Sequence, residues 1–321
     1  MRRLGIILVF FAFFVGIFGC GNDNPVDVQS QKNLIPETYA FSSTIGKFGG
    51  GDGEFNRPHG IVVDKSGNLY VADVNNSRIQ KFTSDGIFLR KWGCPFPKSV
   101  AVDSSGNVYT ISSGCIQKFT SDGIFLRKWA LMPKYLSSDS PIDLAVDGKS
   151  VYAVPNFSPV RGYIQKFSLD GAFIKEWETW DFDDPWYPLR NESVYANPSS
   201  LSVDRLGYVY VLCTARYNYS FPNDTCIQKF SSDGIFLGKW ATSGIDSYQI
   251  RRGIAVDNKG SVYVLTSENF HKYSSSGKFL YRSTDIRFKD PYGIAVFNEI
   301  VYIVDCSGSC IQEFGRQKSF E

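Results

Sequence analysis

The stretches Gly60-Ile-Val-Val-Asp64 and Ile79-Gln-Lys-Phe82 decide the fold of this chain, because both return along the sequence. In the second copy they read Val100-Ala-Val-Asp103 and Ile116-Gln-Lys-Phe119. A tyrosine stands between the two stretches in each copy. The six equivalent tyrosines lie 39 to 58 residues apart and are Tyr70, Tyr109, Tyr152, Tyr210, Tyr263 and Tyr302. Self-similarity at such a spacing is the signature of a repeat protein.

A full copy contains four short strand patterns. The first is rich in Ile, Val and Ala and ends at an aspartate, and the second carries the tyrosine. The third is the Ile-Gln-Lys-Phe stretch, and the fourth is of the type Ile87-Phe-Leu-Arg-Lys-Trp92. Gly-Asn and Asp-Gly pairs between the patterns are hairpin signals. Six such units predict an all-β fold, a six-bladed β-propeller with four-stranded antiparallel blades.

The sixth copy lacks a fourth strand pattern after Ile311-Gln-Glu-Phe314. Before the first copy, Thr44-Ile-Gly-Lys-Phe48-Gly49 resembles Phe88-Leu-Arg-Lys-Trp92-Gly93. We therefore expect this N-terminal strand to complete the sixth blade and to close the ring, which removes exposed strand edges. The alternative is that Ser319-Phe-Glu321 supplies the strand.

The first strand of most copies carries small residues on one face, and we interpret them as a packing requirement near the propeller axis. Examples are Gly60, Ser99, Ser200 and Gly253, whereas the third copy departs from the rule with Asp143.

Composition narrows the functional class. The chain has 321 residues, of which 43% are hydrophobic, so it can bury a substantial core and is not compositionally disordered. The formal net charge of +2 argues against nucleic acid as a general partner, because nucleic-acid binders usually show a basic excess.

The N-terminus predicts export. Met1-Arg2-Arg3 precedes the uncharged apolar run Leu4–Phe18, and Gly19-Cys20 follows, which is the pattern of a secretory signal. Ile17-Phe-Gly-Cys20 resembles the lipobox of bacterial lipoproteins, which implies cleavage after residue 19 and a lipid on Cys20. An uncleaved anchor helix is the alternative, although the run is short for a membrane span.

We divide the chain accordingly into a signal peptide over 1–19, a flexible tether over 20–38 and a propeller over 39–321. The tether is polar and aperiodic. The expected location is the bacterial cell envelope, with the lipid as the only membrane attachment. Gly21 after the lipidated cysteine favours the outer membrane in a Gram-negative cell, because Asp at that position favours inner-membrane retention in such lipoproteins.

The copies resemble the NHL repeat family. The resemblance rests on Gly53-Glu-Phe-Asn-Arg-Pro-His-Gly-Ile-Val-Val-Asp64 and on Val71-Ala-Asp-Val-Asn-Asn-Ser-Arg-Ile-Gln80. It implies a propeller that presents partners to the face built from the loops joining blades. Phe297 replaces the strand-ending aspartate and Phe270-His-Lys-Tyr273 replaces Ile-Gln-Lys-Phe, so we expect altered turns in those blades.

Six cysteines follow Cys20, and three of them directly precede a third strand. We predict disulfides within one face of the propeller, which fits an oxidising compartment. The pairs are Cys94–Cys115, Cys213–Cys226 and Cys306–Cys310. Zinc is the rival interpretation, but the sequence lacks CxxC pairs, so we expect no metal.

Catalytic signatures are sparse. The only two histidines, His59 and His271, fall on different strands of different blades, so they do not predict a shared metal or cofactor. Asp64 and its equivalents stand before a turn in the same register, and we expect their side chains to accept backbone N–H bonds there. We therefore favour a binding protein without a cofactor over an enzyme.

Two candidate binding sites remain. One is the mouth of the central channel, where His59, Lys98, Arg252 and Tyr292 precede inner strands and could hold a carboxylate or phosphate. The other is an aromatic and acidic insertion before the fourth blade, together with an enlarged loop of that blade. Its candidate residues are Trp180, Trp186, Tyr187, Tyr217 and Tyr219.

Exposed Trp and Tyr side chains suit sugar rings or a protein partner. A satellite core under the loop, or solvated charge at the channel mouth, is the alternative interpretation of these residues. We predict a lipid-anchored binding or scaffold propeller that recognises an envelope protein or a glycan. The competing hypothesis is a hydrolase or lyase acting on a small molecule at the channel mouth.

Overall fold

The computed structural model describes residues 37–132, 141–155, 162–179, 195–216, 225–242, 253–284 and 288–317. They belong to a compact unit that begins at Glu37. In this part of the chain the regular elements are β-strands, apart from the short 3-10 turn η2 (Val74–Asn76). None of the described helices has the length and hydropathy of a membrane span. The predicted signal peptide, Cys20 and the tether up to residue 36 lie outside the described residues.

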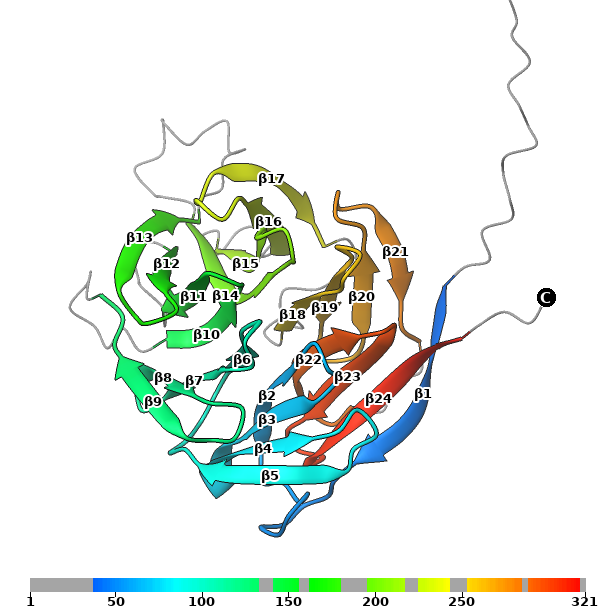
Figure 1. The fold of residues 1–321 in the computed structure, drawn as a ribbon. Coiled ribbons are helices and arrows are strands. Elements are labelled where there is room, and N and C mark those ends of the chain that lie inside the picture. Colours follow the sequence, from blue (N-terminus) through cyan, green and yellow to red (C-terminus); the bar gives the residue numbers. More distant parts are fainter. Residues whose placement is uncertain are drawn as a thin grey trace, which may run out of the picture. The chain divides into compact units, whose positions relative to one another are not determined.

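Six four-stranded antiparallel sheets form the blades of a β-propeller, as predicted (Figure 1). Blade 1 comprises β2 (Pro58–Val63), β3 (Leu69–Asp73), β4 (Arg78–Phe82) and β5 (Phe88–Gly93). Blade 2 comprises β6 (Val100–Val102), β7 (Val108–Ser112), β8 (Cys115–Phe119) and β9 (Phe125–Trp129). Blade 3 comprises β10 (Pro141–Val146), β11 (Ser150–Pro155), β12 (Tyr163–Ser168) and β13 (Phe173–Glu178).

The second half of the ring repeats this order. Blade 4 comprises β14 (Tyr195–Val203), β15 (Val209–Arg216), β16 (Thr225–Phe230) and β17 (Phe236–Ala241). Blade 5 comprises β18 (Gly253–Val256), β19 (Val262–Leu265), β20 (Phe270–Tyr273) and β21 (Phe279–Arg282). Blade 6 comprises β22 (Pro291–Phe297), β23 (Ile300–Asp305), β24 (Cys310–Gln317) and, from the other end of the unit, β1 (Thr38–Ile45).

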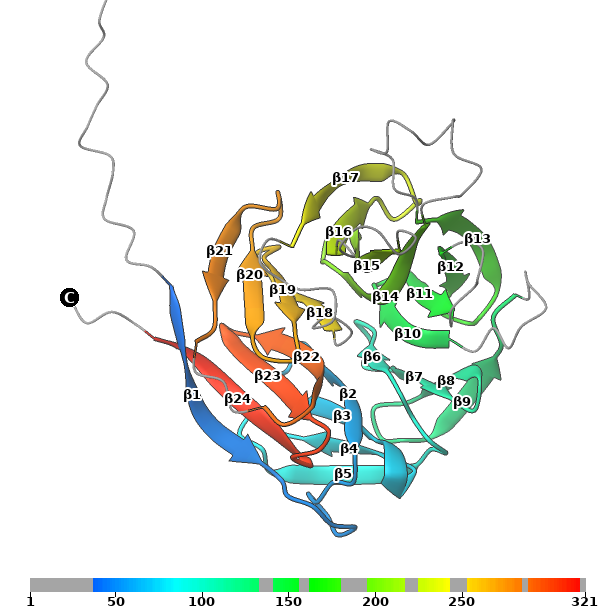
Figure 2. The same ribbon diagram turned by 180° about the vertical axis from the view of Figure 1, so that it is seen from behind.

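Ring closure by an N-terminal strand is confirmed. β1 pairs with β24 along its length, from Thr38 opposite Gln317 to Ile45 opposite Ile311. Figure 2 shows β1 as the outermost strand beside β24. An ion pair between Glu37 and the nearly buried Lys272 fastens the start of β1 to blade 5. The hydroxyls of Tyr39 and Tyr263 also meet, at 3.0 Å.

The segment predicted for this strand was wrong by three residues. In blades 1 to 4 the isoleucine of the third strand lies opposite the tryptophan of the fourth, as Ile79 does opposite Trp92. In blade 6 the residue opposite Ile311 is Ile45, and Phe48 lies beyond the strand. Phe48 instead makes an isolated bridge to Phe55 and is 71% exposed. The aromatic match between Phe48 and Trp92 misled the sequence alignment.

Each fourth-strand tryptophan of blades 1 to 4 packs on a turn glycine of the next blade. A Cβ placed on Gly171 would lie 2.5 Å from the Trp129 ring, and Gly123 meets Trp92 in the same way. Ile45 of β1 takes this role against Gly86 of blade 1. These glycines also have positive φ, so the Asp-Gly turns serve both the hairpin and the contact between blades.

Close approach of the inner strands explains their small residues. A Cβ on Gly60 would lie 2.8 Å from the carbonyl oxygen of Lys98, and one on Gly293 would lie 2.3 Å from that of His59. Two glycines therefore let neighbouring blades meet backbone to backbone, which is the packing requirement expected from the sequence.

The strand-ending aspartates cap their turns, as predicted. Asp103 accepts backbone N–H bonds from Ser105 and Asn107 and a hydroxyl bond from Tyr109. The same pattern recurs at the other four positions, Asp64, Asp147, Asp204 and Asp257.

Of the two departures, only one alters its turn. Phe297 pairs directly with Ile300, and the two residues between them, Asn298 and Glu299, both have positive φ. This is the geometry of a tight two-residue hairpin. The Phe270–Tyr273 stretch, by contrast, forms a regular strand between β19 and β21.

The contact between blades gives a stability prediction with an internal control. Gly171→Ala and Gly106→Ala both place a side chain at positive φ, at 83° and 87°, but nothing lies closer than 3.7 Å to the new Cβ at Gly106. We expect both variants to lose stability through the same backbone strain. Gly171→Ala should lose about 1–3 kcal/mol more of the free energy of unfolding, because the Trp129 ring must move. Urea unfolding of both variants measures the difference. Equal losses would contradict the contact.

Candidate functional site

The inner strands of the six blades surround a channel. Gly60 of β2 lies against Ser99, and Gly293 of β22 lies against His59, so equivalent residues of neighbouring inner strands stand at the same level. The N-terminal ends of these strands therefore gather at one mouth, and the loops that join consecutive blades lie on the same side. A cavity of about 960 Å³ follows the channel and is lined by all six inner strands. This volume is typical of small-molecule sites.

Three of the four predicted mouth residues, His59, Lys98 and Tyr292, line this cavity at its N-terminal mouth. His59 and Tyr292 come from adjacent blades, and their rings stack with centroids 3.9 Å apart and an angle of 14° between planes. Lys98 is exposed and lines the same cavity, and Ser199 of blade 4 lies at the equivalent place. Arg252 lies outside the described residues. The sequence placed His59 and Tyr292 at one mouth, but their stacking has no local signal, because 232 residues separate them.

Irregular strand starts hold these side chains at the mouth. The register of β2 shifts between Pro58 and Ile61, and that of β22 shifts between Pro291 and Gly293. His59 and Tyr292 sit within these irregularities, which re-aim side chains as β-bulges do. In the loop that joins blades 1 and 2, Phe96 has a φ of 47° and is 62% exposed. A bulky residue in that conformation is rare, so this loop holds an aromatic ring in solvent at a cost in strain.

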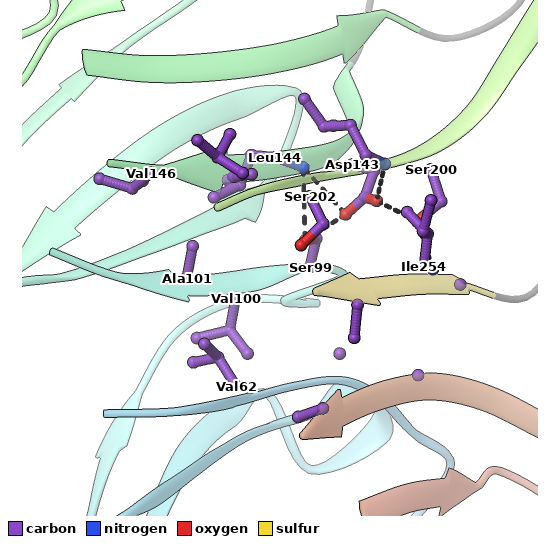
Figure 3. Close-up of a pocket in the computed structure, with 18 of the residues that line it drawn as sticks. Val62, Ser99, Val100, Ala101, Asp143, Leu144, Val146, Ser200, Ser202 and Ile254 are labelled. Carbon is purple, nitrogen blue, oxygen red and sulfur yellow. Dashed lines mark hydrogen bonds between the residues drawn. The ribbon is translucent and has the colours of Figure 1, made fainter. Parts of the chain in front are cut away.

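A ring of six equivalent residues forms a collar one step inside the mouth. Its members are Gly60, Ser99, Asp143, Ser200, Gly253 and Gly293. Asp143 accepts hydrogen bonds from the hydroxyls of Ser99 and Ser200, both at 2.6 Å, and these serines belong to the blades on either side (Figure 3). The amides of Leu144 and Leu201 donate to the same carboxylate at 2.9 and 3.0 Å.

Asp143 is an acidic side chain in a largely enclosed position. It is partly exposed, and its accessible edge lines the channel, while protein surrounds the rest of the side chain. Burial raises the pKa of this carboxyl, and the four hydrogen bonds act against that rise. Among the described residues no cationic side chain pairs with it. Asp143 is the functional candidate that the sequence interpretation missed, although its signal was visible as the one carboxylate among small residues.

The aromatic insertion and the enlarged loop of blade 4 are not described. Trp180, Trp186, Tyr187, Tyr217 and Tyr219 all lie outside the described residues, so these candidates remain predictions. Trp177, which precedes the insertion, packs against the core between blades 3 and 4.

The predicted disulfides remain predictions. Cys213 and Cys226 lie directly opposite each other on β15 and β16, as the pairing requires. Among the described residues, which include all six of these cysteines, the structure contains no disulfide bond. Burial raises the pKa of Cys94 and Cys306, and burial together with Asp305 raises that of Cys310 to about 11. These three thiols are therefore protonated at neutral pH and are poor nucleophiles.

The two histidines occupy different parts of the molecule. His59 lines the channel, whereas His271 lies in β20, the third strand of blade 5, and is 2% exposed. Within the described residues no group of three or more His, Cys, Asp or Glu side chains is placed to hold a metal ion.

Comparison with known proteins identifies the repeat. Residues 55–82 match the family model of the NHL repeat. The chain is 54% identical over 48 residues to the protein lin-41 of Caenorhabditis elegans, a match that covers 15% of this chain and 4% of lin-41. It is 33% identical over 81 residues to the B-box type zinc finger protein ncl-1 of the same organism, covering 23% of this chain and 9% of ncl-1. The matched parts are a small share of both relatives.

Solved structures agree on the fold. A gluconolactonase from Xanthomonas campestris superimposes with a TM-score of 0.58 at 14% identity, over 88% of this chain and 98% of that one. A streptogramin B lyase gives a TM-score of 0.55 at 11% identity, over 87% and 98%. Residues 55–82 are thus an NHL repeat, and the described chain is a six-bladed β-propeller.

The buried histidine gives a pH prediction. Burial, with a contribution from the positive charge of Arg282, lowers the pKa of His271 to about 4. Its unfolded pKa is about 6.5, so the unfolded chain binds more protons between these values and stability falls as the pH drops through that window. We expect the wild type to lose about 2 kcal/mol between pH 7 and pH 5 from this group, and His271→Gln to lack that part of the loss. Urea unfolding at both pH values tests this, and an identical pH dependence in the two proteins would contradict it.

Proposed function

We propose that this protein is an exported binding propeller whose partner contacts the face that carries the N-terminal channel mouth. The observation that carries the proposal is the aromatic and cationic group at that mouth, in which Tyr292 and Lys98 are exposed and His59 is half-buried. His59, Tyr292 and Lys98 come from blades 1, 6 and 2, and none of them belongs to a described hydrophobic core. The exposed Phe96 lies in the loop that joins blades 1 and 2. Aromatic rings beside cationic groups are typical anchors of recognition surfaces.

An envelope protein or a glycan is the partner class we propose. Stacked and exposed rings suit the apolar faces of sugars, and Lys98 adds a group for carboxylates or phosphates. The undescribed insertion with Trp180 and Trp186 follows blade 3 and joins it to blade 4, and its sequence favours the same ligand classes.

An enzymatic role at the channel mouth is the second candidate. It is favoured by Asp143, because a carboxyl with a raised pKa beside a cavity can act as a general acid. The lyase and gluconolactonase that share the fold make this class a natural comparison, although their identity to this chain is too low to carry activity across.

Anchoring belongs to the same proposal. Lipidation of Cys20 would hold the propeller in the envelope through acyl chains, since each buried CH₂ contributes about 0.8 kcal/mol. The polar segment after Cys20 would separate the propeller from the membrane.

Binding to envelope fractions of the native cell tests the proposed face. We expect Lys98→Ala combined with Tyr292→Ala to weaken binding of the full chain by about thirtyfold or more, because two anchors that contribute about 1–2 kcal/mol each contribute about 2–4 kcal/mol together. Lys65→Ala is the matched control, since Lys65 follows β2 and lies at the opposite end of the channel. Loss of binding after protease treatment of the fraction indicates a protein partner, and persistence indicates a glycan. Full binding by the double variant would refute the face assignment.

Lipidation has its own test. We expect the mature protein from its native cell to begin at Cys20 and to carry the mass of a diacylglyceryl group, because the Ile17–Cys20 segment resembles a lipobox. Intact-mass measurement checks this, and Cys20→Ser should retain the signal peptide. A mature wild-type chain without the lipid mass would rule out the anchor.

A further inference from the structure

The carboxyl group of Asp143 lies at the edge of a cavity without a cationic partner among the described residues. Its hydrogen-bond partners are two hydroxyls and two amides, and all of them are uncharged. Buried charges in proteins are normally paired with an opposite charge or a metal ion, because desolvation is costly. Within the described chain no such partner lies beside Asp143, so the cavity itself is the place where a counter-charge can enter.

The serines extend this charge to two further acceptors. Each serine hydroxyl donates its only O–H to Asp143, so it can act only as an acceptor towards any other group. The amide of Leu144 approaches the Ser99 oxygen at 3.4 Å, and that of Ile254 approaches the Ser200 oxygen at 3.3 Å. A hydroxyl oxygen has two lone pairs, so each serine keeps one for a ligand. Both serines line the cavity.

Two residues further along the inner strands, five of the six equivalent positions that line the cavity are apolar. They are Val62, Ala101, Ala145, Ala255 and Ala295, and the sixth is Ser202. The site therefore offers a carboxyl group and hydrogen-bond acceptors on one side, on blades 2 to 4, and mostly apolar walls further in (Figure 3). That combination selects a cation that donates hydrogen bonds and carries an apolar body.

We propose that the channel binds a small primary amine, with its ammonium group against the Ser99–Asp143–Ser200 collar and its apolar part in the channel. A single carboxylate is a poor site for Ca²⁺, which takes about six to eight oxygen ligands. An ammonium group has three N–H donors, and the free lone pairs of the two serine oxygens can accept two of them beside the Asp143 carboxyl group. This site lies inside the channel and does not depend on the proposed partner face, so either proposal can fail alone.

Calorimetric titration of the full chain in mild detergent tests the assignment with benzylammonium as the probe. We expect benzylammonium to bind, benzyl alcohol not to bind, and benzyltrimethylammonium to bind more weakly because it lacks N–H donors. Asp143→Asn should weaken benzylammonium about tenfold or more, since the charge is lost at nearly constant shape. Asp147→Asn is the matched control, because Asp147 lies in the same blade, caps a turn and does not line the cavity.

Thermal unfolding shows whether the Asp143→Asn variant folds. If it does not fold, two serine variants test the proposal instead. Ser99→Ala and Ser200→Ala keep Asp143 and each removes one hydrogen-bond acceptor. Each should weaken the binding of benzylammonium severalfold, and neither should allow benzyl alcohol to bind. Equal binding of benzylammonium and benzyl alcohol, unchanged affinity in a folded Asp143→Asn variant, or no binding of benzylammonium would overturn the proposal. If Ca²⁺ binds and prevents benzylammonium from binding, the ligand is a metal cation and the proposed amine site is wrong.

Discussion

The pairing of β1 with β24 is the interaction on which the rest of the structure depends. Blades of a propeller contact mainly their neighbours, so nothing but the two ends of the chain can close the ring. The closing strand carries Ile45 against blade 1 and Tyr39 against blade 5, and Glu37 meets Lys272 at its start. These contacts hold blade 6 to both neighbours, and they keep the six inner strands at a common level around the channel.

The distance between neighbouring inner strands decides which side chains line the channel. Around blades 5, 6 and 1 the collar positions are glycines, and at Gly60 and Gly293 the backbones nearly touch. Around blades 2, 3 and 4 side chains replace that contact, and Ser99, Asp143 and Ser200 link the strands through hydrogen bonds. The ring is therefore asymmetric in chemistry although it is nearly symmetric in fold. The Asp143 carboxyl group lies on one side of the channel, and the stacked rings of His59 and Tyr292 lie at the mouth on the other.

Periodicity made the fold predictable, because each blade repeats the same strand patterns and turns. The blade count, the antiparallel order and the capping role of Asp103 and its equivalents all follow from local sequence. The closing strand was placed in the right region but three residues out of register, since the tryptophan of other blades is Ile45 here. The collar was harder, because Asp143 acquires its partners from β6 and β14, which only the closed ring brings beside it. The sequence shows Asp143 as an exception among the small residues of the first strands, but it does not show that Ser99 and Ser200 are its partners.

Hydrogen–deuterium exchange of the full chain, followed by mass spectrometry of peptides from β1 and β24, tests the closed ring most directly. If β1 closes the ring, its amides exchange as slowly as those of β24, and Ile45→Asp speeds exchange in β1, β24 and the inner strands of blades 1 and 6 together. Fast exchange throughout β1 in the wild type, with β22 to β24 protected, would mean that another segment completes blade 6. The common level of the inner strands, and the collar built on it, would then lose their basis.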